Sequence, residues 1–478
     1  MLKSKIIDIL KTFSKAELKS FRDFVASPYH NSNKNVIKTL DQLRKYHPDY
    51  SSPNIKKEKL FAKLFPGKKF NDTVIRILLS DLLKLSEEFL SINSDYSESP
   101  VDYIRLLQEL RDRNLDAVYK KNYKEALDSV KNYPSSRDKF FKMFELEVIN
   151  VEYHLRKDKQ LHISGNILNR AENLIYFMII ELIHTAQDII INEKTYNVKY
   201  DHNILMDFIG NVDLFTFIKN LKPYRPKQYE ILKLHYSLLE ALTDESNEEK
   251  YDEFRKVYLI NQEILSTDEN NHFLNYLETC CLMRSKYNTA KYRLEVFFVY
   301  EHMLKTGAYS FHTNTMTAQR FKNILISAVN LKKIEWAEDF IIKYSPLVQK
   351  EYTESMYHYG LALVKFLKKD FTASLLELNK VKNDYIILKM DIKSWALKNY
   401  YELGYYEQAL AFIDSYRHFL NKNRLITEYL KERHLNFVKF TSELIKRSAG
   451  ETKDGQLKNN IKVVQNVVHK DWLLEKLS

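Results

Sequence analysis

Glycine and proline are scarce in this chain, which holds 8 Gly and 9 Pro among 478 residues. Sheet-rich proteins need many tight turns, and tight turns rely on these two residue types. The glycines also never adopt the GxGxxG or GxxxxGK[ST] spacing of phosphate-binding loops. We therefore expect an all-α protein that lacks a glycine-rich nucleotide-binding loop.

Cysteine and the common catalytic motifs are also rare or absent. Cys280 and Cys281 are adjacent in an expected helix, where their side chains point about 100° apart, so we expect no disulfide between them. The 14 histidines form neither an HExxH motif nor a pair four residues apart, and no GxSxG motif occurs. We expect a protein that is not an enzyme and that has no metal and no cofactor.

Long apolar runs are missing as well. The longest, residues 174–183, is interrupted by Glu181 and is shorter than the roughly 20 residues that span a bilayer. The first residues contain no long apolar segment followed by small residues, as a signal peptide would. These features predict a cytoplasmic protein without a membrane partner.

The charge is positive and uneven. The chain has 74 Lys and Arg against 63 Asp and Glu, a net charge of +11. Residues 1–95 hold 18 basic and 11 acidic residues, and so contribute +7 of that charge. A basic surface suits nucleic acid, but a lysine-rich soluble surface is the simpler interpretation, because net charge alone identifies no ligand.

Helix signals are strongest in residues 1–95. Ser14 and Glu17 fit a capping box, and Phe13 and Leu18 fit the accompanying hydrophobic staple. We expect helices at about 14–27, 33–46 and 56–64, and then a long, buried one that begins at Asn71 or Asp72. The polar segment 91–100 predicts the end of this basic N-terminal helical domain.

A repeated pattern follows further along the chain. Ala337, Ser374 and Ala409 each lie three residues after an aromatic or apolar residue at the expected start of a helix, and residues 122–126 have the same form around Ala126. The first three are 37 and 35 residues apart. Small residues at such positions let antiparallel helices approach closely, which indicates a helical repeat.

These residues resemble the tetratricopeptide repeat (TPR) family. The clearest unit is 390–420, and weaker units are 318–345 and 353–382, the last with Gly360 at the glycine position of the family. The signature positions of the clearest unit are occupied by Ala396, Leu397, Tyr400, Gly404, Tyr406, Ala409, Ile413 and Tyr416. The opening segment also resembles an uncharacterised bacterial family with TPR-like C-terminal regions.

The resemblance implies a right-handed solenoid of antiparallel helix pairs after the N-terminal domain. We divide the chain into a basic helical domain (1–95), irregular helical repeats (96–317), TPR-like repeats with a capping helix (318–447) and a tail with a short helix (448–478). In the TPR family, the first helix of each repeat lines a concave groove that binds a peptide or a helix.

By that register, nine residues would face the groove. They are Gln319, Lys322, Glu354, Tyr357, Asp391, Ser394, Lys398, Tyr401 and Glu402. Two other interpretations stay open: these residues could form ordinary solvated helix faces, or other helices of the chain could fill the groove. Ile326 stands where the family's carboxylate-binding pattern has Asn, so we do not expect recognition of a chaperone tail.

A basic run at residues 417–447 provides a second candidate site. Its phosphate-binding residues would be Arg417, Lys422, Arg424, Lys431, Arg433 and Lys439. Phe437 and Phe440 are interleaved with them, and their spacing is more simply that of the core face of a capping helix.

Our functional hypothesis is a non-enzymatic scaffold or adaptor that binds a peptide or helix of a protein partner in the groove. Tyr357 and Tyr401 would be the anchors, and Lys322 and Lys398 would pair with acidic groups. The alternative is a nucleic-acid-associated regulator that uses the basic N-terminal domain or the 417–447 run. Self-assembly through the ends of the repeats is a third hypothesis.

Overall fold

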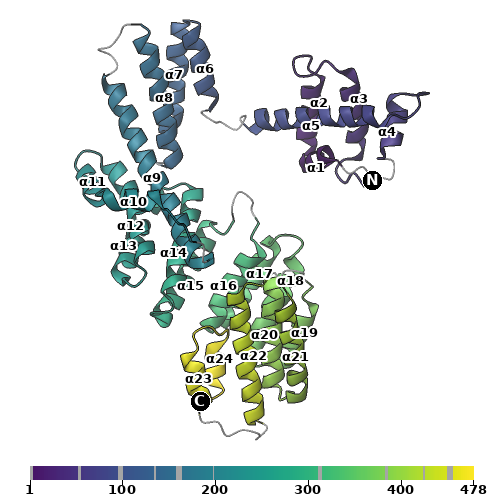
Figure 1. Ribbon diagram of the computed structural model, residues 1–478, viewed down its shortest axis with the longest axis vertical. Helices are drawn as coiled ribbons and strands as arrows, with labels where there is room; N and C mark the ends of the chain where they lie inside the picture. The colour runs from purple at the N-terminus through teal and green to yellow at the C-terminus, as the bar shows by residue number, and fades with distance from the viewer. Residues whose placement is uncertain are drawn as a thin grey trace. The chain divides into compact units, whose positions relative to one another are not determined.

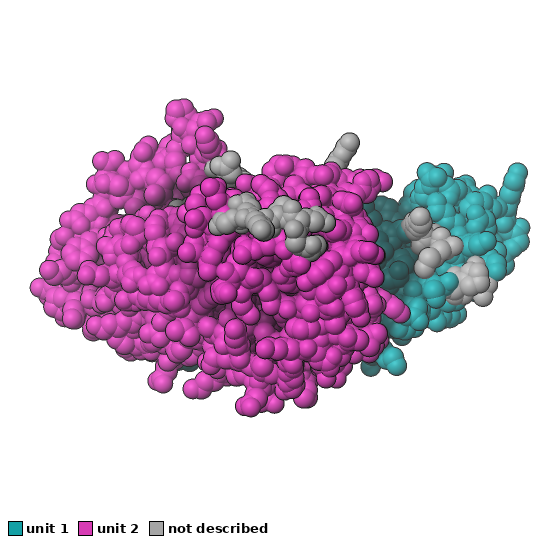
Figure 2. Space-filling view, turned by 90° about the horizontal axis from the view of Figure 1, so that it is seen from below, with its two compact units in different colours: residues 1–133, 138–174 teal, residues 134–137, 175–478 magenta. Residues whose placement is uncertain are grey.

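The chain is all-α, as its composition predicts. The computed structural model (Figure 1) describes residues 4–51, 55–94, 101–133, 136–157, 164–196, 199–310, 315–382, 386–423, 426–448 and 456–478. Within these ranges every regular element is a helix, and one isolated bridge joins Met316 to Val348. Figure 2 colours two compact units, residues 1–133 with 138–174 and residues 134–137 with 175–478.

The N-terminal helices surround one long helix. They are α1 (Lys5–Thr12), α2 (Lys15–Ala26), α3 (Lys34–Leu43), α4 (Lys57–Leu64) and α5 (Asp72–Ser94), and α5 packs against each of the other four (Figure 1). The capping box is confirmed, because Ser14 accepts from the Glu17 amide and Glu17 accepts from the Ser14 amide. Phe13 and Leu18 are buried in the shared core. Residues 95–100 of the predicted boundary lie outside the described residues.

The rest of the first unit has its own core, formed by α6 (Val101–Asp112), α7 (Asp116–Lys131) and α8 (Arg137–Leu155). The start of α9 (Ser164–Tyr196) also belongs to this unit. One prediction is wrong here. Ala126 was placed at the start of a second helix, but α7 begins at Asp116, so Ala126 lies deep inside the helix. The position that matches Ala409 is Tyr119, which is buried and stacks on Tyr153. An aromatic ring here therefore replaces the small residue.

The second unit continues with α10 (Ile204–Asn211), α11 (Leu214–Leu221), α12 (Pro226–Thr243), α13 (Glu248–Asn261), α14 (Thr267–Arg284) and α15 (Thr289–Thr306). α12 pairs with α13, and α14 pairs with α15. Arg284, only 1% exposed, donates through one terminal nitrogen to the carbonyls of Ala241 and Asp244, at 2.7 and 2.9 Å. This side chain therefore fixes the α12–α13 connection to α14. Cys280 and Cys281 are both free and buried.

Three helix pairs and further C-terminal helices complete the second unit. They are α16 (Ala318–Asn330), α17 (Ile334–Tyr344), α18 (Thr353–Leu367), α19 (Phe371–Lys380), α20 (Ile386–Glu402), α21 (Tyr406–Lys422), α22 (Glu428–Ser448), α23 (Leu457–Val463) and α24 (Lys470–Glu475). The first helices α16, α18 and α20 pack in succession as one layer, and each also packs against its own second helix, α17, α19 or α21 (Figure 1). This is a solenoid of helix pairs.

The same turn joins the two helices in each of these pairs. Lys332, Lys369 and Gly404 have φ angles of 57°, 63° and 71°, and each lies two residues after a first helix and two before a second. The next amide then bonds to the carbonyl five residues back, as in Lys333 to Ala328. Asn114, between α6 and α7, follows the same rule. The left-handed turn is thus a backbone feature that recurs in each repeat, whichever side chain occupies the position.

Gly360 lies where two neighbouring pairs approach closely. A Cβ atom built on Gly360 would lie 2.7 Å from Cγ1 of Ile341, a fully buried side chain of α17. Contacts this short do not occur between real carbon atoms, so any other residue at position 360 requires the Ile341 side chain or its helix to shift.

We expect Gly360→Ala to lower the free energy of unfolding by about 1–3 kcal/mol, the usual cost of overpacking a tight core. The matched control is Gly210→Ala in α10, where an added Cβ meets nothing within 4 Å. That control should be neutral or slightly stabilising, because alanine favours helix over glycine. Urea unfolding followed by tryptophan fluorescence suits the test, since all three tryptophans belong to the second unit. Equal stabilities of the two variants would contradict the packing argument.

The helix α9 extends well beyond the apolar run at residues 174–183 on which the sequence-based expectation for this region rested. Its segment Ser164–Glu193 is by length and composition apolar enough to cross a membrane, because its most apolar 18-residue window has a mean hydropathy of 1.7. Of that window, 39% is buried. Core helices of soluble proteins pass the same test. In the second unit α9 contacts α12 and α14, through His184 with His235 and through Asp188 with Tyr276. The cytoplasmic location stays a prediction.

Three histidine rings meet where α9, α12 and α14 pack together. Nε2 of His184 lies 3.2 Å from Nδ1 of His235, and the His184 and His272 ring centroids are 4.7 Å apart. Burial, followed by the nearby His184, lowers the pKa of His272 to about 3 and lowers the pKa of His235 well below its usual value. The folded protein therefore holds the His235 and His272 rings neutral at pH values where the unfolded chain protonates them.

This cluster predicts an acid-sensitive second unit. Because the folded-state pKa of His272 is depressed, its stabilising contribution is present above pH 6.5 and is lost as the pH falls below that value. We expect His272→Phe to recover about 1–2 kcal/mol of the stability lost between pH 7 and pH 5. The control is His418→Phe, at an exposed position of α21. Parallel pH profiles for the two variants in urea unfolding would contradict the assignment.

Candidate functional site

The nine predicted groove residues lie on one layer of helices. Gln319 and Lys322 are on α16, Glu354 and Tyr357 on α18, and Asp391, Ser394, Lys398, Tyr401 and Glu402 on α20. Their exposures differ. Lys322, Ser394 and Lys398 are buried, Glu354 and Tyr357 are exposed, and the other four are partly buried. We call the side of α16, α18 and α20 that carries these residues the first-helix face.

An ion pair joins the two ends of this layer. Nζ of Lys322 on α16 lies 2.6 Å from Oδ2 of Asp391 on α20, and the two side chains are only 9% and 17% exposed. α18 packs between α16 and α20 in the layer, so a direct pair between its outer members requires the layer to curve toward this face. The acidic partner of Lys322 in this structure is therefore a residue of its own chain.

Ser394 belongs to a buried polar network behind the face. Its Oγ lies 3.0 Å from Oη of Tyr416 and 3.2 Å from Nδ1 of His434, and Tyr416 donates to the Met390 carbonyl at 2.8 Å. Burial lowers the pKa of His434 to about 4. Ser394 is fully buried, so the network ties α20, α21 and α22 together and offers no hydroxyl to an external molecule.

The short helix α24 lies against the end of the first-helix face. Nε1 of Trp472 donates to Oε1 of Glu402 at 2.6 Å, and Nζ of Lys476 lies 2.6 Å from the same oxygen. The Trp472 ring packs edge to face on Tyr401, with centroids 5.3 Å apart, and also contacts Phe437 of α22. The chain thus fills this part of its own face, which was one of the interpretations left open by the sequence.

A second ion pair anchors the start of α24 elsewhere. Oδ2 of Asp471 lies 2.5 Å from a terminal nitrogen of Arg293 on α15. His469, just before the helix, has a left-handed backbone with φ 55°, and its ring contacts Trp395 and Phe437. α24 therefore bridges α15 and α20 through one ion pair near each of its ends, and it reaches α22 through ring contacts with Phe437.

Lys398 lies beneath Trp472 in an aromatic cage. Its Nζ is 3.6 Å from the Trp395 ring centroid, 4.4 Å from that of Phe366 and 5.6 Å from that of Trp472. Among the described residues, no carboxylate forms an ion pair with it. Burial lowers the pKa of Lys398 well below its usual value, and the carboxylates of Glu402 and Glu475 oppose this shift.

The other predicted anchor residues are not brought together. Tyr401 and Glu402 meet at α24, whereas Tyr357 on α18 contacts its neighbour His358. Among the described residues, no hydrogen bond or ion pair links Glu354 or Tyr357 to the remaining groove residues. Gln319 bonds to Asn323 on its own helix.

The alternative phosphate-binding residues lie on α21 and α22. Arg417 pairs with Asp414, Lys431 pairs with Glu428, and Arg433 stacks on Tyr429. Lys422 and Lys439 are exposed, and Arg424 lies outside the described residues. The interleaved Phe437 and Phe440 are buried, so the apolar side of α22 is a core face as the sequence indicated.

No protein-family model, no curated protein and no solved structure matches the chain. Among the described residues there is also no group of three or more His, Cys, Asp or Glu side chains arranged to hold a metal ion. The site therefore has to be interpreted from its own geometry.

Sequence reasoning missed the role of α24. It placed a short helix within residues 448–478 but assigned none of its side chains to the site. The available signal was Trp472, one of three tryptophans in the chain, followed four residues later by Lys476 on the same helix face. A tryptophan in a short polar segment needs a surface on which to bury its ring.

The cage around Lys398 allows a stability test. We expect Lys398→Met to raise the free energy of unfolding by about 1–3 kcal/mol, because an apolar chain of similar length replaces a buried amine. Lys439→Met, on the exposed side of α22, is the control and should change little. A clear loss of stability in Lys398→Met, measured by urea unfolding, would mean that attraction between the ammonium and the rings outweighs its desolvation.

Proposed function

We propose that α16–α22 form a TPR-like protein-interaction module, and that the chain acts as a scaffold or adaptor which takes a short helix of a protein partner on the first-helix face. The observation that carries the proposal is the way in which α24 packs on the first-helix face. A helix of only six residues is held there by an aromatic anchor and by two ion pairs. A surface that accommodates this helix from its own chain can accommodate a similar one from another.

The contacts of α24 define the chemistry of such a partner. Glu402 accepts from an indole N–H and from an ammonium four residues further along, so a fitting helix carries Trp and Lys at positions i and i+4. Arg293 adds a preference for an acidic residue just before the Trp. Tryptophan buried among Tyr401, Phe437 and Lys398 is the kind of anchor that dominates interface energies.

The intramolecular helix also sets the threshold for binding. A tethered segment has an effective concentration of roughly millimolar, so a partner helix has to bind better than α24 or act when α24 is displaced. Weakening α24 in the full chain should therefore increase the affinity for a helix added in solution.

The experiment uses a labelled peptide with the sequence of residues 466–478 and the full chain carrying Trp472→Ala. We expect this variant to bind the peptide at least about tenfold more tightly than the unaltered chain, because its own α24 has lost the anchor. Fluorescence anisotropy measures both affinities. A chain carrying Val463→Ala, a truncation at a 79% exposed site on α23, should behave as the unaltered chain.

The same anisotropy measurement can also contradict the proposal. A peptide with alanine in place of its tryptophan should bind neither chain. If the Trp472→Ala chain fails to bind the unaltered peptide, the first-helix face is not a site for external helices and the proposal is wrong.

Salt and nuclease treatment distinguish a protein partner from the nucleic-acid alternative. In capture from a native lysate, a protein partner should remain bound after nuclease treatment and between 50 and 200 mM salt, whereas contacts to 6–10 phosphates would weaken about 10³–10⁵-fold over that range. Retention of material only in the absence of nuclease would favour the basic surfaces. A mass that rises with concentration would favour self-assembly.

A further inference from the structure

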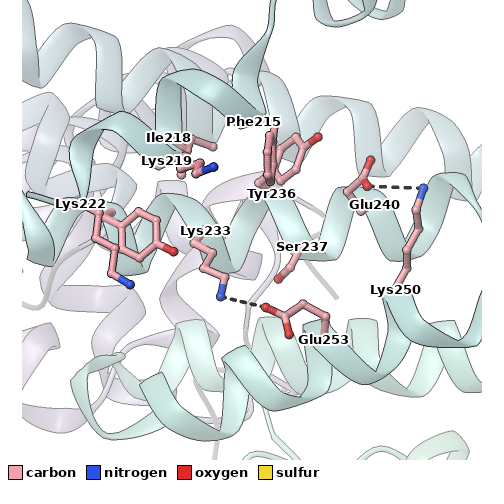
Figure 3. Close-up of a pocket in the computed structure, with 11 residues that line it drawn as sticks. Phe215, Ile218, Lys219, Lys222, Lys233, Tyr236, Ser237, Glu240, Lys250 and Glu253 are labelled. Atoms are coloured by element: carbon pink, nitrogen blue, oxygen red, sulfur yellow. Dashed lines mark ion pairs between the residues drawn. The ribbon is translucent and has the colours of Figure 1, made fainter.

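A pocket of about 420 Å³ lies among α11, α12 and α13, in a part of the chain that the proposed function does not use (Figure 3). Its volume is in the range of sites that hold small molecules, roughly 300–1,000 Å³. The lining side chains come from residues 215–253, well before the first-helix face in the sequence.

One side of the pocket is apolar and aromatic. Phe215 and Ile218 of α11 line it together with Tyr236 of α12 (Figure 3), and the Phe215 and Tyr236 ring centroids are 6.3 Å apart. Tyr229 also lines the pocket. Phe215 is 58% exposed, although a large aromatic side chain is usually covered in a folded protein. An apolar ligand body would cover this ring and would gain free energy from the area removed from water.

The charges around the pocket are unequal. Four lysines and two glutamates line it. Lys233 pairs with Glu253 at 2.8 Å, and Lys250 pairs with Glu240 at 3.4 Å (Figure 3). Both carboxylates are therefore neutralised by lysines of the pocket itself.

The remaining two lysines have no acidic partner among the described residues. Nζ of Lys219 lies 6.0 Å from the Phe215 ring centroid, and Nζ of Lys222 lies 5.5 Å from that of Tyr229. The two are three residues apart at the end of α11 and so lie on the same side of it. The pocket combines an apolar wall with two cations that no carboxylate of the chain neutralises.

We propose that this pocket binds a medium-chain fatty acid, with the aliphatic chain against Phe215, Ile218 and Tyr236 and the carboxylate at Lys219 and Lys222. A cation would meet a net charge of +2, and a polyphosphate would leave the aromatic wall uncovered. A carboxylate with an apolar body matches both halves of the lining. This inference does not depend on the proposed function of the first-helix face.

Isothermal titration of the full chain with decanoate tests the proposal. We expect saturable binding of one decanoate per chain, and binding of the uncharged decanol about tenfold weaker, because the alcohol lacks the charge that pairs with the two lysines. Decyltrimethylammonium, which has the same chain length and the opposite charge, should not bind measurably.

Variants then locate the site. Lys219→Glu with Lys222→Glu should weaken decanoate binding at least about tenfold, and Phe215→Ala should weaken it severalfold by removing apolar contact. The matched control is Lys227→Glu with Lys256→Glu, which changes the charge equally at exposed lysines of α12 and α13 outside the pocket. Binding by the control should remain within about twofold of the unaltered chain.

Four results would overturn the proposal. They are absence of saturable decanoate binding, equal binding of decanoate and decanol, an equal loss in the control pair, and no loss in the Lys219→Glu with Lys222→Glu chain. All altered residues are exposed, and unchanged circular dichroism melting would show that each variant is folded.

Discussion

Close contact between neighbouring helix pairs is the constraint on which the second unit depends. At Gly360 the backbone of α18 leaves no room for even one methyl group beside Ile341. Each pair is closed by a left-handed residue whose hydrogen bonds are completed within the turn itself, at Lys332, Lys369 and Gly404. These local conditions fix the pairs, and the layer of first helices follows from stacking them.

The charge of the first-helix face is determined by side chains that become buried when the helix pairs stack. Lys322 and Asp391 neutralise each other across the layer, so the charge there is internal. Glu402 remains as the acidic group at the end of the face, and it accepts from both Trp472 and Lys476 of α24. Glu402 and Trp472 lie near the aromatic cage that contains Lys398.

The sequence was sufficient for the helical class, for the capping box at Ser14 and for the spacing of Ala337, Ser374 and Ala409, because these depend on residues close together in the chain. It failed at Ala126, since the same short pattern occurs inside a helix that begins ten residues earlier. The sequence identified the helices of the candidate site but did not indicate that Lys322, Ser394 and Lys398 are buried. α24 contacts residues about seventy positions away, and no local pattern encodes such a contact.

The self-contained turn also has a consequence for how this architecture can change in length. Because each turn satisfies its hydrogen bonds within a few residues, a whole helix pair can be duplicated or lost without leaving unpaired backbone groups in its neighbours. The left-handed residue recurs 37 and then 35 residues later, so the unit length itself tolerates small insertions within the helices. Descent by gain and loss of pairs would change such a chain in steps of one unit, while the turn itself is retained.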